Sequence, residues 1–176
     1  MKILALDIAT TVGIAVGDAS GNPTAWSETL GKKGQDDLLF SRSLVLTSKL
    51  IEQHKPDLIA YEGAVGGDRT SHYLVGIIAC IRGCATNRGI PLLGCNIGAI
   101  RKHFIGQHIT SAQYKHLRKG AAKATARADA KAAVQRQCKV LGWQADNEDA
   151  ADACAVWSFA VGQTTRAAKV GGLFGA

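Results

Sequence analysis

Long apolar runs are absent from this chain of 176 residues. The longest, residues 74–75 and 77–81 on either side of Gly76, are far shorter than the roughly 20 apolar residues that span a bilayer. The N-terminal apolar stretch reaches an acid, Asp7, too early for a secretory signal peptide. We therefore expect a cytoplasmic protein, neither secreted nor embedded in a membrane.

The sequence also lacks the cysteine pattern of a disulfide framework or a zinc site. Its five cysteines are an odd number, and no export signal accompanies them. Cys80 and Cys84 stand four residues apart in an apolar helical pattern, but no CxxC pair and no matching pair of histidines completes a metal site. We expect buried structural thiols.

Charged residues are few, at 20% of the chain, while 47% of its residues are hydrophobic. A disordered chain has the opposite balance, so disorder is excluded. Because domains usually hold about 100–200 residues, a chain of this length is expected to form one domain with a core of its own.

Positive charge is concentrated in one segment. The formal net charge is +7, and ten of the 21 basic residues fall between residues 101 and 139, where Asp129 is the one acid. A solvated helix face usually mixes both signs, whereas a one-sign segment favours a polyanionic partner, most simply nucleic acid. The ten residues are Arg101, Lys102, Lys115, Arg118, Lys119, Lys123, Arg127, Lys131, Arg136 and Lys139.

The periodicity of apolar residues predicts an α/β fold. Three strands joined by short turns open the chain and form an antiparallel unit, and two later strands alternate with helices, which makes them parallel to the first strand. The predicted strands are residues 2–8, 12–18, 24–30, 58–61 and 91–96. The predicted helices are a stripe over 38–51 and residues 70–87, 97–105, 126–141 and 147–162. We thus expect a five-stranded mixed sheet, three strands antiparallel and then two parallel, flanked by helices.

Four acids stand where solvent-exposed charges are not expected. Asp7 and Glu62 each end an apolar strand, and Asp149 and Asp152 open a helix that is apolar nearly all round. Taken singly, each has an ordinary explanation: a turn former, a strand-end charge, or two acids at a positive helix N-terminus that Asp146 or Asn147 caps.

Taken together, the four acids favour a metal site. Carboxylates packed closely repel one another, and a divalent cation such as Mg²⁺ or Mn²⁺, which prefers carboxylate oxygens, removes that repulsion. Metal-holding acids next to a basic segment suggest phosphodiester hydrolysis, in which two ions about 3.5–4 Å apart activate water and stabilise the leaving oxygen.

Three motifs resemble the RuvC-type Holliday-junction resolvases of the ribonuclease H-like superfamily, in a phage or otherwise divergent form. Residues 4–13 (LALDIATTVG) are similar to the first strand and turn of that family, with Asp7 as the first metal ligand. Residues 59–62 (IAYE) resemble the strand that ends in its second acid, Glu62. Residues 149–153 (DAADA) resemble its C-terminal signature and carry Asp149 and Asp152.

The resemblance implies a function. A single ribonuclease H-like nuclease domain would cover residues 1–162, followed by a flexible, Gly-rich, basic tail over 163–176. A homodimer would nick two strands of a four-way junction, leaving 5′-phosphates, in DNA recombination and repair in a bacterial or phage-infected cell. The four acids would be the catalytic residues and would bind two Mg²⁺ ions, for which Mn²⁺ substitutes, with no protein nucleophile.

The resemblance also extends to the basic segment. Residues 98–106 and 128–134 are similar to stretches in which the family carries DNA-binding lysines, at the positions of Arg101 and Lys131. Phosphate contacts of this kind give affinity without base readout and a steep salt dependence. The residues expected to bind DNA are Arg101, Lys102, Lys119, Lys123 and Lys131.

One departure from the family leaves the substrate open. Bacterial members carry an aromatic residue shortly after the second acid that helps to open base pairs, whereas this chain has residues 65–67 (VGG) there and Tyr73 further along. Flaps or other branched DNA are therefore alternative substrates. A YqgF-like RNA-processing nuclease and a non-catalytic module that binds DNA junctions are the remaining alternatives, since residues 12–18 also resemble the second strand of the former.

Overall fold

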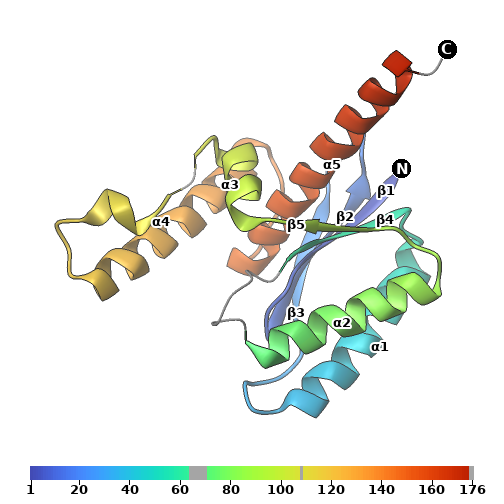
Figure 1. Ribbon diagram of the computed structural model, residues 1–176, viewed down its shortest axis with the longest axis horizontal. Coiled ribbons are helices and arrows are strands. Elements are labelled where there is room, and N and C mark those ends of the chain that lie inside the picture. The colour runs from blue at the N-terminus through green and yellow to red at the C-terminus, as the bar shows by residue number, and fades with distance from the viewer. Residues whose placement is uncertain (64–70, 108, 175–176) are drawn as a thin grey trace.

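The computed structural model describes residues 1–63, 71–107 and 109–174, and for 167–174 only the backbone. Five strands form one sheet in the order β3-β2-β1-β4-β5, with β1, β2 and β3 antiparallel and β4 and β5 parallel to β1 (Figure 1). The strands are β1 (Lys2–Asp7), β2 (Thr11–Asp18), β3 (Thr24–Thr29), β4 (Leu58–Glu62) and β5 (Leu92–Cys95). The predicted mixed sheet is therefore confirmed.

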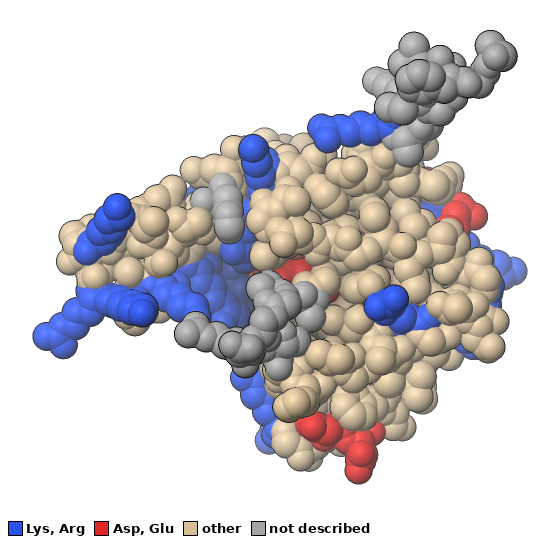
Figure 2. Space-filling view, viewed as in Figure 1, with Lys and Arg blue, Asp and Glu red and all other residues tan. Residues whose placement is uncertain are grey.

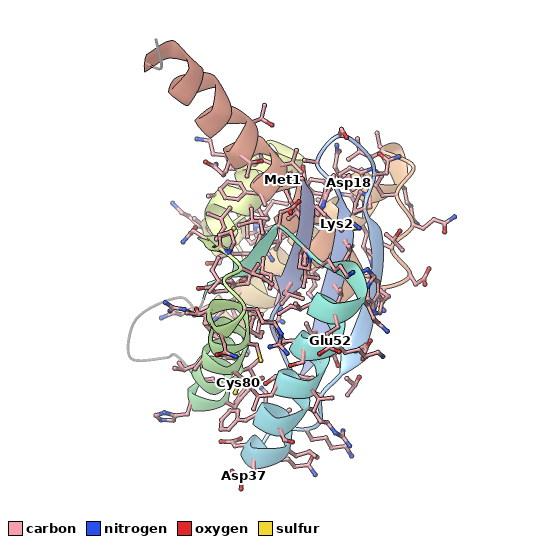
Figure 3. All side chains as sticks on the ribbon, turned by 90° about the vertical axis from the view of Figure 1, so that its right-hand side faces the viewer. Met1, Lys2, Asp18, Asp37, Glu52 and Cys80 are labelled. Carbon is pink, nitrogen blue, oxygen red and sulfur yellow. The ribbon has the colours of Figure 1, made fainter. Side chains whose placement is uncertain are left out.

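Helices cover both faces of this sheet. Seen from the side, α1 and α2 run along one face, with Glu52 on α1 and Cys80 on α2, and α5 lies on the other (Figure 3). The helices are α1 (Asp36–His54), α2 (His72–Asn87), α3 (Ile97–Ile105), α4 (Lys119–Val140) and α5 (Glu148–Phe174), with a 3₁₀ helix, η1 (Ser111–Tyr114). None of the described helices is long and apolar enough to cross a membrane.

The core has two layers because the side chains of a strand alternate between its faces. Leu4 and Leu6 pack with Leu50 beneath α1 and α2, whereas Ile3 and Ala5 pack beneath α5. All four side chains of β1 are essentially inaccessible to water. All five cysteines are free thiols, as expected, although Cys80 is only half-buried.

Small side chains let α5 approach the sheet closely. Ala5, Ala15 and Ala60 form the sheet side of this layer, and at Gly13 even a Cβ atom would collide with the carbonyl oxygen of Asp149. The first turn of α5 is therefore held against β2, beside the carboxyl end of β1, which places the helix-borne acids near the strand-borne ones.

Helix α4 begins seven residues earlier than predicted, at Lys119 instead of residue 126. Residues 119–125 (KGAAKAT) have good helix propensity but no apolar stripe, because this end of the helix leaves the body of the protein and packs against η1. The hydroxyl of Tyr114 on η1 donates a hydrogen bond to Asp129 on α4. Together η1 and the N-terminal half of α4 form an arm that projects from the sheet (Figure 1).

Helix α5 also continues beyond its predicted end. The sequence predicts a stop at Gly162 and a frayed tail after it, but the helix runs on to Phe174, so the predicted helix end is wrong. Gly162 is a packing residue, because a Cβ atom there would lie 2.8 Å from Cε1 of His103 on α3. No proline interrupts the residues that follow, so the helix can continue. The domain boundary at residue 162 stays a prediction.

Candidate functional site

The four acids singled out in the sequence line one cavity at the carboxyl end of β1. The cavity has a volume of about 470 Å³, and Asp7, Glu62, Asp149 and Asp152 all line it. In the space-filling view, acidic atoms lie at the centre of the molecule, between the body and a gathering of basic side chains (Figure 2). Residues that are 145 positions apart in the sequence thus share one site.

Strand register brings Asp7 and Glu62 together. The parallel pairing of β1 with β4 aligns Leu6 with Tyr61, so that the next residue of each strand is an acid at the same edge of the sheet. The Asp7 carboxyl group donates a hydrogen bond to the carboxylate of Glu62. This hydrogen bond raises the pKa of Asp7 and lowers that of Glu62.

The N-terminus of α5 supplies the other two acids. Asn147 caps the helix by accepting a hydrogen bond from the backbone N–H of Ala150 at 2.9 Å, and its side-chain amide donates to Ser27 of β3 at 2.8 Å. Asp149 and Asp152, three residues apart, then project from one face of the helix. Because Asn147 performs the capping, the carboxylates are not needed for it.

Burial and repulsion between carboxylates disfavour ionisation of Asp7, Glu62 and Asp152. Burial, with the three neighbouring carboxylates, raises the pKa of Asp7 well above its usual value. Burial and Asp152 raise the pKa of Glu62, against the opposing effect of Arg101. Burial also raises the pKa of Asp152 to about 6, although Arg101 lowers it. A site that gathers unfavourable negative charge is suited to a cation.

Cations line the same cavity as the acids. Arg101, Arg127 and Lys131 line the same cavity, and the ammonium of Lys131 makes an ion pair with Glu148 at 2.8 Å. Lys33, in the loop after β3, also lines it and lies 5.9 Å above the centre of the Tyr73 ring. Lys33 and Arg127 were not predicted to belong to the site, and nothing in the sequence near Lys33 indicates that its loop reaches the acids.

A basic stripe leads from the cavity along α4. Lys119, Lys123, Arg127 and Lys131 recur at intervals of four residues, which places them along one side of the helix. This spacing is the signal that could have identified Arg127. Of the residues expected to bind DNA, Arg101 and Lys131 line the cavity, Lys119 and Lys123 lie on the stripe, and Lys102 is exposed on α3 outside the cavity lining.

Tyr73 also lines the cavity. It follows the second acid by eleven positions in the sequence, but α2 begins close enough to β1 to bring its ring beside the acids. Residues 65–67, where the family carries its aromatic, lie outside the described residues.

The donor set of the cavity fits a hard divalent cation, although the side chains are not arranged as ligands. Its four acids offer only carboxylate oxygens, the atoms that Mg²⁺ and Mn²⁺ prefer. The raised pKa values of Asp7, Glu62 and Asp152 reflect burial and a repulsion between carboxylates that such an ion would relieve. As placed, no three His, Cys, Asp or Glu side chains within residues 1–63, 71–107 and 109–174 gather closely enough to hold a metal ion.

Solved structures identify the fold. No family model and no curated protein matches the sequence. RuvC of Thermus thermophilus superposes with a TM-score of 0.65 at 14% identity, over 94% of this chain and 97% of that one. The same protein in complex with a Holliday junction substrate gives 0.65 at 11% identity, over 94% and 96%. The yeast mitochondrial Holliday junction resolvase Ydc2 gives 0.52 at 14% identity, over 93% and 80%. The expected RuvC-type, ribonuclease H-like fold is confirmed.

Proposed function

We propose that this protein is a structure-selective DNA endonuclease that resolves four-way junctions. The observation that carries the proposal is the convergence of four acids in one cavity, at the end of a basic stripe, on a fold shared with two junction resolvases. The fold alone would not suffice, because one fold hosts many functions, so the proposal depends on the acids and the basic stripe as well.

In this proposal Asp7, Glu62, Asp149 and Asp152 hold two Mg²⁺ ions, or Mn²⁺ in their place. When bound, such ions activate water for attack on phosphorus and stabilise the leaving O3′ atom, which leaves a 5′-phosphate. The four acids must all be ionised to act as ligands. Arg101, Arg127 and Lys131, which line the same cavity, would orient the phosphate and draw charge from its free oxygens.

The basic stripe would hold the DNA by its backbone. Lys119, Lys123 and Arg127 continue from the cavity along the arm, and this side of the arm carries a continuous gathering of basic side chains (Figure 2). Contacts to phosphates position a duplex without reading its sequence. A four-way junction offers several converging backbones, which suits a surface that extends away from the site.

Paired cuts require two sites, so we propose a homodimer with one cavity in each subunit. Two symmetric nicks in opposite strands of a junction would then come from one bound complex. Mass determination by light scattering, with and without junction DNA, tests this part: a mass of one chain throughout would contradict it.

The function is tested by cleavage of end-labelled DNA in Mg²⁺ or Mn²⁺, on a four-way junction, a flap and a linear duplex of the same sequence. We expect paired symmetric nicks in the junction, with ligatable 5′-phosphate ends, and little cutting of the duplex. Cleavage confined to the flap would make it a flap nuclease, and cleavage of RNA alone an RNA-processing nuclease. Tight junction binding without cleavage in either metal would show that the protein is a non-catalytic module that binds DNA junctions.

A further inference from the structure

A second, smaller cavity adjoins the one that contains the acids. Its volume is about 160 Å³, and it lies between α3, the N-terminal side of η1 and the stripe of α4. Its polar lining consists of three cations, Arg101, Lys123 and Arg127, and two hydroxyl groups, those of Thr110 and Ser111. We call it the three-cation pocket.

The three cations of this pocket form no ion pair within the described residues, although Arg101 and Arg127 also line the cavity of the acids and lower the pKa of Glu62 there. No carboxylate occurs among its lining residues. The ion pairs within the described part of the chain join Arg88 to Glu52 and Lys131 to Glu148, and so none of the pocket's cations takes part in them. Three cations around one small cavity repel one another unless an anion lies between them.

Arg101 supplies an independent sign that a ligand is missing. Its Nε atom is buried and has no hydrogen-bond partner in the described structure. A buried polar donor without a partner is costly, and native proteins rarely leave one unpaired. A guanidinium group usually satisfies its donors by a two-pronged contact with a carboxylate or a phosphate.

The pocket adjoins the cavity of the acids, because two residues line both. Arg101 and Arg127 line both, whereas Lys123, Thr110 and Ser111 line the pocket and not the larger cavity. An anion in the pocket therefore lies beside whatever group is bound at the acids. The pocket is also smaller than the roughly 300–1,000 Å³ of sites for drug-sized molecules, which suits a single phosphate group better than a nucleoside.

We propose that the three-cation pocket binds one backbone phosphate of the strand that is cleaved, a phosphate next to the one attacked at the acids. This inference rests on the proposed nuclease function. The pocket would fix the register of the strand, so that a single phosphodiester bond faces Asp7 and Asp152 while its neighbour is held by Arg101, Lys123 and Arg127. The hydroxyl groups of Thr110 and Ser111 would donate to the remaining phosphate oxygens.

The test is a scan of four-way junctions in which one phosphate at a time near the cleavage site is replaced by an uncharged methylphosphonate. Binding is measured by fluorescence anisotropy in EDTA, so that no strand is cut. For the unmodified protein we expect one linkage, other than the cleaved one, at which the replacement raises Kd by about tenfold, the effect of one charge-assisted hydrogen-bonding group.

Two variants, one inside the pocket and a matched control outside it, test whether the pocket binds the phosphate of that linkage. In Lys123→Gln the replacement at this linkage should raise Kd by no more than about twofold, since the contact is already lost. In Lys119→Gln, one turn away on the same stripe and outside the pocket, the full effect should persist. Both positions are exposed on α4, so both variants should fold.

The outcomes separate this inference from the proposed function. Two results would overturn phosphate binding by the pocket without contradicting the proposed nuclease function. One is junction binding with no sensitive linkage, and the other is a sensitive linkage whose effect is unchanged in Lys123→Gln. Competition by inorganic phosphate at constant ionic strength, without any sensitive linkage, shows that the pocket takes a free anion and also overturns the proposal. Absence of all DNA binding overturns both.

Discussion

Three of the four acids in the cavity destabilise the metal-free protein that holds them. Burial and repulsion raise the pKa of Asp7, Glu62 and Asp152 above their values in the unfolded chain. Between the unfolded and the folded pKa, the native state therefore binds more protons than the unfolded state, and its stability falls as the pH rises. For Asp152 this interval lies between about 4 and about 6.

Asp152→Asn should consequently stabilise the metal-free protein at neutral pH. A pKa of about 6 in place of 3.8 corresponds to a cost of about 3 kcal/mol for the ionised form, which the neutral amide does not incur. In EDTA at pH 7 we expect the variant to be more stable by up to about 3 kcal/mol, with the difference shrinking towards pH 4. Urea unfolding at several pH values measures it.

Asp146→Asn is the control, because Asp146 is an exposed acid three residues before Asp149 and outside the cavity of the acids. Asp146→Asn should show no comparable pH-dependent increase in the free energy of unfolding. Mg²⁺ at pH 7 should raise the stability of the wild-type protein more than that of Asp152→Asn, since binding to the native state stabilises it. Equal stabilities of wild type and Asp152→Asn from pH 4 to 7 would argue against a strained cluster of acids.

At the level of elements, the sequence predicted the strands of the sheet better than the bounds of α4 and α5. The strands were found because buried β-branched and aliphatic runs end at clear turn signals such as residues 18–23. The start of α4 was missed because this end projects and packs only on η1, so no apolar stripe marks it. The end of α5 was missed because Gly162 resembles a helix stop but serves the packing of His103.

The residues of the candidate site also fall into two groups, those that the sequence alone identifies and those that only the fold reveals. The four acids were identifiable because each interrupts an apolar element at its end, a local feature of the sequence. Lys33 was not, because only the three-dimensional fold brings the loop after β3 to the acids. Arg127 was passed over within a generally basic segment, where the four-residue spacing that places it on the stripe becomes meaningful only once the helix is known to start at Lys119.

The contact of α5 with β2 makes Gly13 a sensitive position. Gly13→Ala would place a Cβ atom against the carbonyl oxygen of Asp149 and displace the first turn of α5. We expect a loss of about 1–3 kcal/mol in the free energy of unfolding, typical of overpacking, and a larger loss of nuclease activity than this destabilisation explains. Urea unfolding and cleavage rates at a temperature where the variant is folded measure the two effects.

Gly83→Ala is the matched control for this change. Gly83 lies on the exposed side of α2, and a Cβ atom there would meet nothing within 4 Å. Alanine should therefore stabilise the helix by about 0.5–1 kcal/mol and leave cleavage unchanged. Wild-type activity in a folded Gly13→Ala protein would show that the close approach of α5 does not position Asp149.

The whole molecule is electrically asymmetric. The basic residues that line the cavity come from α3, α4 and the loop after β3. Helix α1, which covers the opposite face of the sheet, carries charges of both signs. From this distribution we expect a nucleic acid to bind on one side of the protein, with a strong dependence on salt because bound counterions are released from DNA.

Single lysines of the stripe should therefore change the salt dependence of DNA binding. We expect Lys119→Gln to reduce the slope of log K against log salt concentration by about 0.9 and to weaken binding to junction and duplex alike. Lys49→Gln on α1, at a surface remote from the cavity, should leave the slope unchanged. Anisotropy titrations at several salt concentrations measure the slopes. Equal slopes for the two variants would show that the stripe does not bind DNA.

The central claim is that the converging acids cut branched DNA, and the most direct measurement compares two variants on one substrate. Asp149→Asn and Asp146→Asn alter acids three residues apart, one inside the cavity and one outside it. On an end-labelled four-way junction in Mg²⁺, the account predicts a loss of at least about 10²-fold in cleavage rate for Asp149→Asn, with junction binding retained, and a rate within about twofold of wild type for Asp146→Asn. Equal cleavage by both variants would contradict the account.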